Sequence, residues 1–166
     1  MPAYPLLLTE LDCVRVVVIG GGAVAERKVV GLIEGGAYPH VISPRLTSRL
    51  HALEQAGALA WLPRVYVEGD LIGAALALAA TDDRAVNACV AAEARQLGIL
   101  LNVADAPKEG NFTTTATVRR GDLVLAVTTC GASPALAATI RRELEAQYGP
   151  EYALLLAELR ELRDGR

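Results

Sequence analysis

A glycine-rich turn offers the clearest chemistry in this sequence. Gly20, Gly22 and Ala25 fit the pattern G-x-G-x-x-A, a dinucleotide-binding fingerprint when it lies between a strand and a helix. The first glycine permits the turn, the second lets backbone approach a pyrophosphate, and the alanine allows close packing of helix on strand. The phosphates would meet free N–H groups at the positive end of the helix dipole. The same residues also suit a turn that only connects a strand to a helix.

The residues around the turn predict the elements that such a fingerprint requires. The apolar run 14–19 predicts a strand, and a helix is expected directly after the glycines, ending at Gly35 and Gly36. A second strand is expected over 40–43. The turn is therefore expected to complete a first strand–helix–strand unit.

Pro44 and Arg45 follow the second strand at a position that bears on cofactor choice. An acidic residue commonly holds the ribose of NAD about 20 residues beyond the glycines. This strand end carries no acid. Pro44 and Arg45 are candidates to contact the adenosine half of the cofactor, and Arg45 leaves the 2′-phosphate of NADP open as an alternative.

Two later apolar runs end in polar residues. The run 75–80 leads into Thr81, and the run 99–103 leads to Asp105. Such runs are typical of strands covered on both faces, and their alternation with helical patterns predicts an open, mainly parallel α/β sheet. Ligands of these sheets lie beyond the carboxyl ends of the strands. We therefore expect the glycine turn, Thr81 and Asp105 to converge at one edge.

The remaining elements complete the sequence-based expectation. A lead-in over 4–11 could lie on a sheet edge, and Asp82 and Asp83 are expected as helix cap and cofactor-loop residue respectively. The further elements expected are a helix over 47–56, a strand within 58–66, a helix after Asp83, hairpin strands over 113–118 and 123–129, a helix capped by Ser133 that runs to about 147, and a last helix from about 150.

Composition limits the partners and the compartment. The net charge of −3 argues against a nucleic-acid partner, which requires clustered positive charge. No apolar run is long enough to span a bilayer, and no basic segment precedes an N-terminal apolar one, so we expect no membrane partner and a cytoplasmic location. The three cysteines show no C-x-x-C spacing, and the sequence predicts no metal site.

The ordered set of short motifs resembles the precorrin-2 dehydrogenase family, which includes the N-terminal module of siroheme synthase. The resemblance covers most of the chain, to about residue 147. The motifs are YPLLLTEL from Tyr4, VIGGGAVAERK from Val18, AATDD from Ala79, NVADAP from Asn102, the segment at Phe112, and TTCGASPALA from Thr128.

The resemblance implies an architecture, a reaction and a set of site residues. It implies a Rossmann-type NAD-binding domain over 1–112, a small strand–helix dimerisation region over 113–148 and a short helical tail over 149–166, in a homodimer. The reaction is NAD-dependent oxidation of precorrin-2, a tetrapyrrole, to sirohydrochlorin, with Asp105 as the catalytic residue. The implied cofactor-binding residues are Gly20, Gly21, Gly22, Ala23, Val24, Pro44, Arg45 and Thr81.

The chemistry of the residues is compatible with this reaction, and alternatives stay open. The oxidation removes a hydride, which NAD accepts, and a proton, which a nearby carboxylate such as Asp105 can take. Taken alone, Asp105 also suits a turn or cap just before Pro107. Some family members also insert ferrous iron, and a nucleotide-binding sensor without catalysis is the alternative function. Candidates by position for holding the substrate carboxylates are Lys108, Arg119, Arg120, Arg141 and Arg142.

Overall fold

The computed structural model describes residues 3–165, which fall into two compact units. One unit is Leu6–Thr113, and the other contains residues 114–165 together with residues 3–5. Each unit is described by itself. The three-part division into 1–112, 113–148 and 149–166 stays a prediction.

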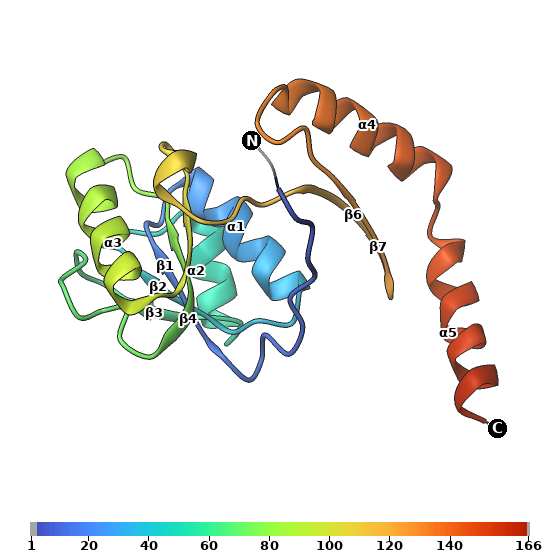
Figure 1. Ribbon diagram of the computed structural model, residues 1–166. Helices are drawn as coiled ribbons and strands as arrows, with labels where there is room; N and C mark the ends of the chain where they lie inside the picture. The colour runs from blue at the N-terminus through green and yellow to red at the C-terminus, as the bar shows by residue number, and fades with distance from the viewer. Residues whose placement is uncertain (1–2, 166) are drawn as a thin grey trace. The chain divides into compact units, whose positions relative to one another are not determined.

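The larger unit is built on a five-stranded parallel sheet with the strand order β3-β2-β1-β4-β5 (Figure 1). Ile19 at the end of β1 pairs with Ile42 on one side and with Ala79 on the other, so the carboxyl ends of the strands share one edge. The strand order reverses between β1 and β4, where open α/β sheets bind ligands. The strands are β1 (Arg15–Ile19), β2 (Pro39–Ile42), β3 (Ala60–Leu62), β4 (Ala74–Ala79) and β5 (Leu100–Val103).

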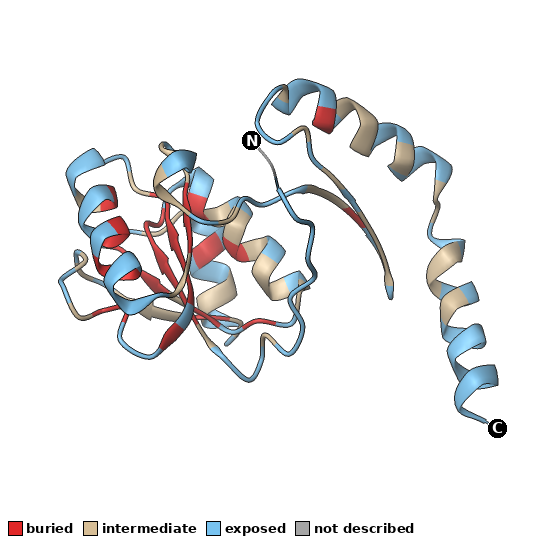
Figure 2. Cartoon of the chain, viewed as in Figure 1, coloured by how far each residue is buried: buried red, intermediate tan, exposed pale blue. Residues whose placement is uncertain are grey.

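Helices cover both faces of this sheet. The first two helices pack on one face, where Val29 and Leu50 join a buried cluster with Val18. The third helix packs on the other face, where Val90 joins a cluster with Val17. Figure 2 shows the resulting band of buried residues along the sheet. The helices are α1 (Ala23–Glu34), α2 (Ser48–Gln55), α3 (Arg84–Leu97) and the short 3-10 helix η1 (Pro107–Glu109).

The apolar run that predicted β1 reflects burial on both faces of the strand. Val16, Val17 and Val18 are all fully buried, and successive side chains alternate between the two clusters. A central parallel strand has no solvent face, so each position is apolar. The expected α/β fold with a mainly parallel sheet is confirmed.

The smaller unit consists of a hairpin and two helices. An antiparallel pair is followed by α4, whose first turn is capped by Ser133, because its Oγ accepts a hydrogen bond from the Leu136 N–H at 3.2 Å. The predicted cap is therefore confirmed. The elements are β6 (Ala116–Arg120), β7 (Leu123–Val127), α4 (Pro134–Gln147) and α5 (Glu151–Asp164).

The short strand expected within 58–66 is confirmed as Ala60–Leu62, directly before Pro63. Two other local expectations are corrected by the structure. Residues 4–10 form no strand, and Pro5 among them lacks the N–H that a ladder needs. The cap of α3 is Asp83, whose carboxylate accepts from the Ala85 N–H at 2.8 Å, because the helix begins one residue later than a cap at Asp82 requires. No helix among the described residues has the length and apolarity to cross a membrane.

Candidate functional site

The first residue of the turn after β1, Gly20, has to be a glycine because of the strands around it. Gly20 has a φ of 120°, which side-chain-bearing residues rarely adopt, and a Cβ there would lie 2.4 Å from the carbonyl oxygen of Ala80. Its N–H donates to the carbonyl of Ile42 at 2.9 Å. Gly20 therefore allows the chain to pass between the ends of β2 and β4.

The next two glycines differ from each other. A Cβ on Gly21 would lie 2.1 Å from the carbonyl oxygen of Arg45, whereas a Cβ on Gly22 would meet no protein atom within 4 Å. Gly22 is also the N-cap of α1, and no side chain caps this helix end. The N–H groups of the first turn, including those of Ala23 and Val24, therefore have no side-chain cap, and open space lies beside Gly22. Such a space at a helix N-terminus fits the pyrophosphate of a dinucleotide.

The loop after β2 is tied to the glycine turn. The Thr47 N–H donates to the Gly21 carbonyl at 3.0 Å, and the Ser43 hydroxyl donates to the Arg45 carbonyl at 2.7 Å. Pro44 and Arg45 are both exposed. The backbone of this loop is therefore held in place while its side chains remain accessible beside the turn.

Thr81, at the end of β4, is held by a buried asparagine that sequence reasoning did not single out. The Asn87 carboxamide oxygen accepts from the Thr81 N–H at 3.3 Å and from its Oγ1 at 2.8 Å. The Asn87 Nδ2 donates to the Thr81 carbonyl at 3.1 Å. Asn87 lies on the first turn of α3, and its side chain thereby fixes the loop that leads into that helix.

Asp105, beyond the end of β5, is joined to the same asparagine. Nδ2 of Asn87 donates to Oδ1 of Asp105 at 3.0 Å, while the Asp105 side chain remains 39% exposed. Thr81 and Asp105 are therefore brought together at the carboxyl edge as expected, through a shared partner. The sequence gives one indication of Asn87: it is a polar residue three and four positions before Val90 and Ala91, on the buried face of the helix.

Charged groups complete the surroundings of Asp105. The Arg84 Nε lies 3.8 Å from Oδ2 of Asp105, and its guanidinium also donates to Glu109. The hydrogen bond with Glu109, together with the negative charges of Glu109 and Asp105, raises the pKa of Arg84. Asp105 thus has one oxygen fixed by a buried amide and the other near an exposed cation.

A second buried tie fixes β5 on the opposite face of the sheet. Lys28 Nζ donates to Oδ1 of Asn102 at 2.6 Å, and Nδ2 of Asn102 donates to the Phe112 carbonyl at 3.1 Å. Burial, with a smaller contribution from Arg27, lowers the pKa of Lys28. These contacts connect α1, β5 and the segment at Phe112.

Comparison with known protein families assigns the larger unit. The sequence model of the family described as "Putative NAD(P)-binding" matches residues 7–116. The chain belongs to this family. A second family, described as "Sirohaem biosynthesis protein central", matches residues 120–147. The NAD(P)-binding match covers the glycine turn, Thr81 and Asp105 together.

Among individual proteins, the chain is similar to siroheme synthases. The chain is 41% identical to siroheme synthase 1 of Aeromonas salmonicida, over 86% of this chain and 31% of the relative. It is 40% identical to siroheme synthase of Stutzerimonas stutzeri, over 96% of this chain and 34% of the relative. The chain thus spans about a third of the length of these curated relatives.

A solved structure extends the similarity to the whole fold. It is named "SirC, precorrin-2 dehydrogenase", and it matches with a TM-score of 0.79 and 32% identity, covering 97% of this chain and 79% of that one. The resemblance drawn from the sequence motifs is thereby confirmed.

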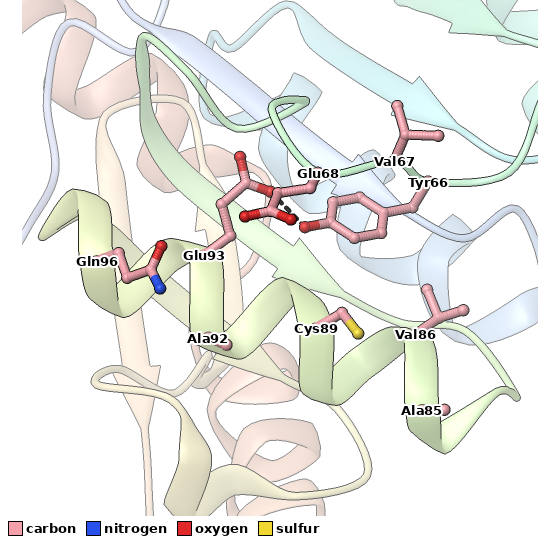
Figure 3. A pocket seen from close by; sticks show the side chains of 9 residues that line it. All are labelled: Tyr66, Val67, Glu68, Ala85, Val86, Cys89, Ala92, Glu93 and Gln96. Carbon is pink, nitrogen blue, oxygen red and sulfur yellow. Dashed lines mark hydrogen bonds between the residues drawn. The ribbon is translucent and has the colours of Figure 1, made fainter.

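The NAD(P)-binding unit also carries a hollow of about 420 Å³ along α3 (Figure 3). Its wall includes Tyr66 and the buried Glu93, whose carboxylate accepts hydrogen bonds from the Gly69 N–H at 3.0 Å, the Leu71 N–H at 3.1 Å and the Tyr66 hydroxyl. Burial and this hydrogen bond raise the pKa of Tyr66. The carboxylate therefore holds the loop 66–71 in place, and both of its oxygens accept hydrogen bonds from that loop.

In the smaller unit, Arg120, Arg141 and Arg142 have hydrogen-bond partners, and the Arg142 guanidinium donates to the Thr139 hydroxyl at 3.2 Å. Arg120 donates to the carbonyls of Tyr148 at 3.0 Å and Glu145 at 3.2 Å, which fixes the junction after α4. Arg141 pairs with the Glu145 carboxylate at 2.6 Å, an ordinary pair one helical turn apart. Lys108, in the larger unit, and Arg119 and Arg142, in the smaller, are exposed.

Proposed function

We propose that this protein is an NAD-dependent dehydrogenase that oxidises precorrin-2 to sirohydrochlorin. The observation that carries the proposal is an exposed carboxylate, Asp105, held at the sheet edge that also bears the open glycine turn. The matched structure named precorrin-2 dehydrogenase and the siroheme synthase relatives supply the substrate class. A carboxylate that can accept a proton, near a site that can bind a dinucleotide, is suited to a reaction that removes a hydride and a proton.

The cofactor site of the proposal fits the residues present. The open space at Gly22 and the uncapped start of α1 suit a pyrophosphate, and the bound nicotinamide would supply the hydride acceptor. The residues proposed to hold the cofactor are Gly20, Gly21, Gly22, Ala23, Val24, Pro44, Arg45 and Thr81.

In this mechanism, the Asp105 carboxylate would take the proton that precorrin-2 loses and then release it to water. A bound NAD would supply the acceptor for the hydride. The products are sirohydrochlorin, NADH and one proton, so atoms and electrons balance. The 39% exposure of Asp105 lets its carboxylate reach both substrate and solvent.

The proposal includes a homodimer formed through residues 113–148, with the tail 149–166 contributing. Its support is a set of exposed leucines on α5, a stripe expected of a helix face that packs on another surface. These leucines are Leu154, Leu155, Leu159 and Leu162. A cytoplasmic location is part of the proposal, supported by cysteines at 13, 89 and 130 that are free and exposed, as expected in a reducing compartment.

An anaerobic assay with precorrin-2 tests the function. The protein is incubated with the substrate and either NAD or NADP, and sirohydrochlorin and reduced nucleotide are measured in parallel. We expect turnover with NAD. Nucleotide binding without turnover would instead identify a sensor, and faster turnover with NADP would assign Arg45 to a 2′-phosphate.

A further inference from the structure

We propose that Asn87 is a positioning residue of this reaction, which fixes the Asp105 carboxylate to the Thr81 loop and selects the oxygen that takes the proton. The inference rests on the proposed function and deepens it. Asn87 touches neither substrate nor cofactor in this scheme. It acts through the residue that does.

Both ends of the Asn87 carboxamide have hydrogen-bond partners. A carboxamide offers two N–H donors and one oxygen with two lone pairs. The donors go to the Thr81 carbonyl at 3.1 Å and to Asp105 Oδ1 at 3.0 Å. The oxygen accepts from the Thr81 N–H at 3.3 Å and lies 2.8 Å from the Thr81 hydroxyl, which also reaches the Asp83 carbonyl at 3.0 Å. Asn87 is fully buried, with an exposure of 0%. A buried amide satisfied at every position has one orientation of low energy.

The partners of Asn87 determine which end of its amide faces Asp105. The backbone N–H of Thr81 can only donate, so the atom it meets is the oxygen of Asn87. The NH2 group is therefore the end that meets Asp105 Oδ1. A donor on Oδ1 leaves Oδ2 as the oxygen available for an incoming proton.

Among residues 3–165, the side chains that contact the Asp105 carboxylate are Asn87 and Arg84, and Asn87 is the better fixed of the two. Arg84 lies 3.8 Å from Oδ2, with its side chain 48% exposed, and exposed ion pairs of this kind contribute little. Asn87 instead joins the segments that follow β4 and β5, so the carboxylate and the proposed cofactor loop keep a fixed separation. A displacement of the reacting group by about 1 Å is enough to cost roughly 100-fold in rate.

The test replaces Asn87 with a residue of the same shape. In Asn87→Asp, the oxygen that accepts from Thr81 is retained, but the donor to Asp105 is lost and a second carboxyl faces it. We expect kcat to fall roughly 10- to 100-fold while the Kd for NAD stays within about threefold of wild type. Two adjacent carboxyls raise the pKa of one of them, so the acidic limb of the pH–kcat profile should move to higher pH. Other charged groups on the surrounding elements are Asp82, Asp83, Arg84, Lys108 and Glu109.

A second variant and a matched control separate positioning from folding. Asn87→Ser, which is uncharged, should lower kcat without the upward shift of the pH profile, and it replaces Asn87→Asp if that variant does not fold. Glu93→Gln changes an equally buried loop-holding side chain on the same helix, and it should lower Tm with kcat and the pH profile unchanged.

The outcomes are distinguishable from failure of the proposed function. If the wild type does not oxidise precorrin-2, the function itself is wrong. If the wild type turns over and a folded Asn87 variant keeps the wild-type kcat and pH profile, with only a lower Tm as in Glu93→Gln, the positioning role is overturned.

Discussion

Asn87 and Glu93 lie on the same helix, α3, and each is a buried polar side chain that holds a loop. Asn87 bonds Thr81 and Asp105, whereas Glu93 bonds the N–H groups of Gly69 and Leu71 and the Tyr66 hydroxyl. The difference lies in the partner. Asn87 leaves an exposed carboxylate with one oxygen to spare, while the three hydrogen bonds of Glu93 use both of its own oxygens. We therefore expect the contacts of Asn87 to affect the proposed reaction and those of Glu93 to affect stability.

The same contrast extends to the residues around each side chain. At the carboxyl edge of the sheet, a Cβ on Gly22 would meet no protein atom within 4 Å. Near Glu93, Arg64 and Asp70 form a bidentate pair with distances of 2.7 and 2.6 Å, which fastens the same loop again. We therefore expect changes at the carboxyl edge to affect turnover, and changes at the loop to affect stability.

The largest expected effect is at Asp105. Asp105→Asn removes the proton acceptor while it keeps the size of the side chain, so kcat should fall by about 10²- to 10⁴-fold. Binding of NAD, measured by calorimetry, should stay within a few-fold of wild type. Asp12→Asn, at an exposed position outside the site, is the control and should leave kcat unchanged. Full activity of Asp105→Asn would remove Asp105 from the mechanism.

Glu93→Ala should lower stability and leave turnover unchanged. It leaves the N–H groups of Gly69 and Leu71 without their acceptor, so the free energy of unfolding should fall by about 1–3 kcal/mol. Urea unfolding measures this loss. The kcat of the folded variant should match that of the wild type. A fall in kcat comparable to that of Asp105→Asn would contradict the distinction drawn between Asn87 and Glu93.

Substitutions at two glycines of the turn should separate an effect on NAD affinity from an effect on folding stability. Gly22→Ala places a methyl group in open space, so stability should stay within about 1 kcal/mol of wild type. If a pyrophosphate occupies that space, the affinity for NAD should weaken about tenfold, or about 1.4 kcal/mol. Gly20→Ala should instead cost at least roughly 1–3 kcal/mol of folding stability, because of its φ of 120° and its contact with Ala80. Unchanged NAD affinity in Gly22→Ala would place the phosphates elsewhere.

The smallest expected effect is the pH dependence that Asp70 adds to stability. The hydrogen bond from Arg64 lowers the pKa of Asp70 in the folded protein. A lowered folded-state pKa stabilises the protein above the ordinary value of about 3.9, and this contribution is lost as the pH falls through the lowered one. Asp70→Asn should lack that part of the acid-induced loss, roughly 1 kcal/mol, in unfolding measured from pH 5 downward. Identical pH slopes for variant and wild type would contradict this assignment.

Much of the fold could be predicted because its signals are local. The apolar runs at β1 and β4, the glycine turn and the cap at Ser133 each depend on neighbouring residues. Asn87 could not be predicted, because its partners Thr81 and Asp105 lie 6 and 18 residues away and meet it only in the folded sheet. The burial of Glu93 could not be predicted either, because an acidic residue inside a helical pattern is ordinarily exposed.

The most direct measurement is a single-turnover reaction under anaerobic conditions, with the protein in excess over precorrin-2 and NAD present. Sirohydrochlorin and NADH are followed together by their absorbance. The proposal predicts that both appear at the same rate and in equal amounts, and that neither appears within the same time with Asp105→Asn. Binding of NAD without formation of NADH by the wild-type protein would contradict it.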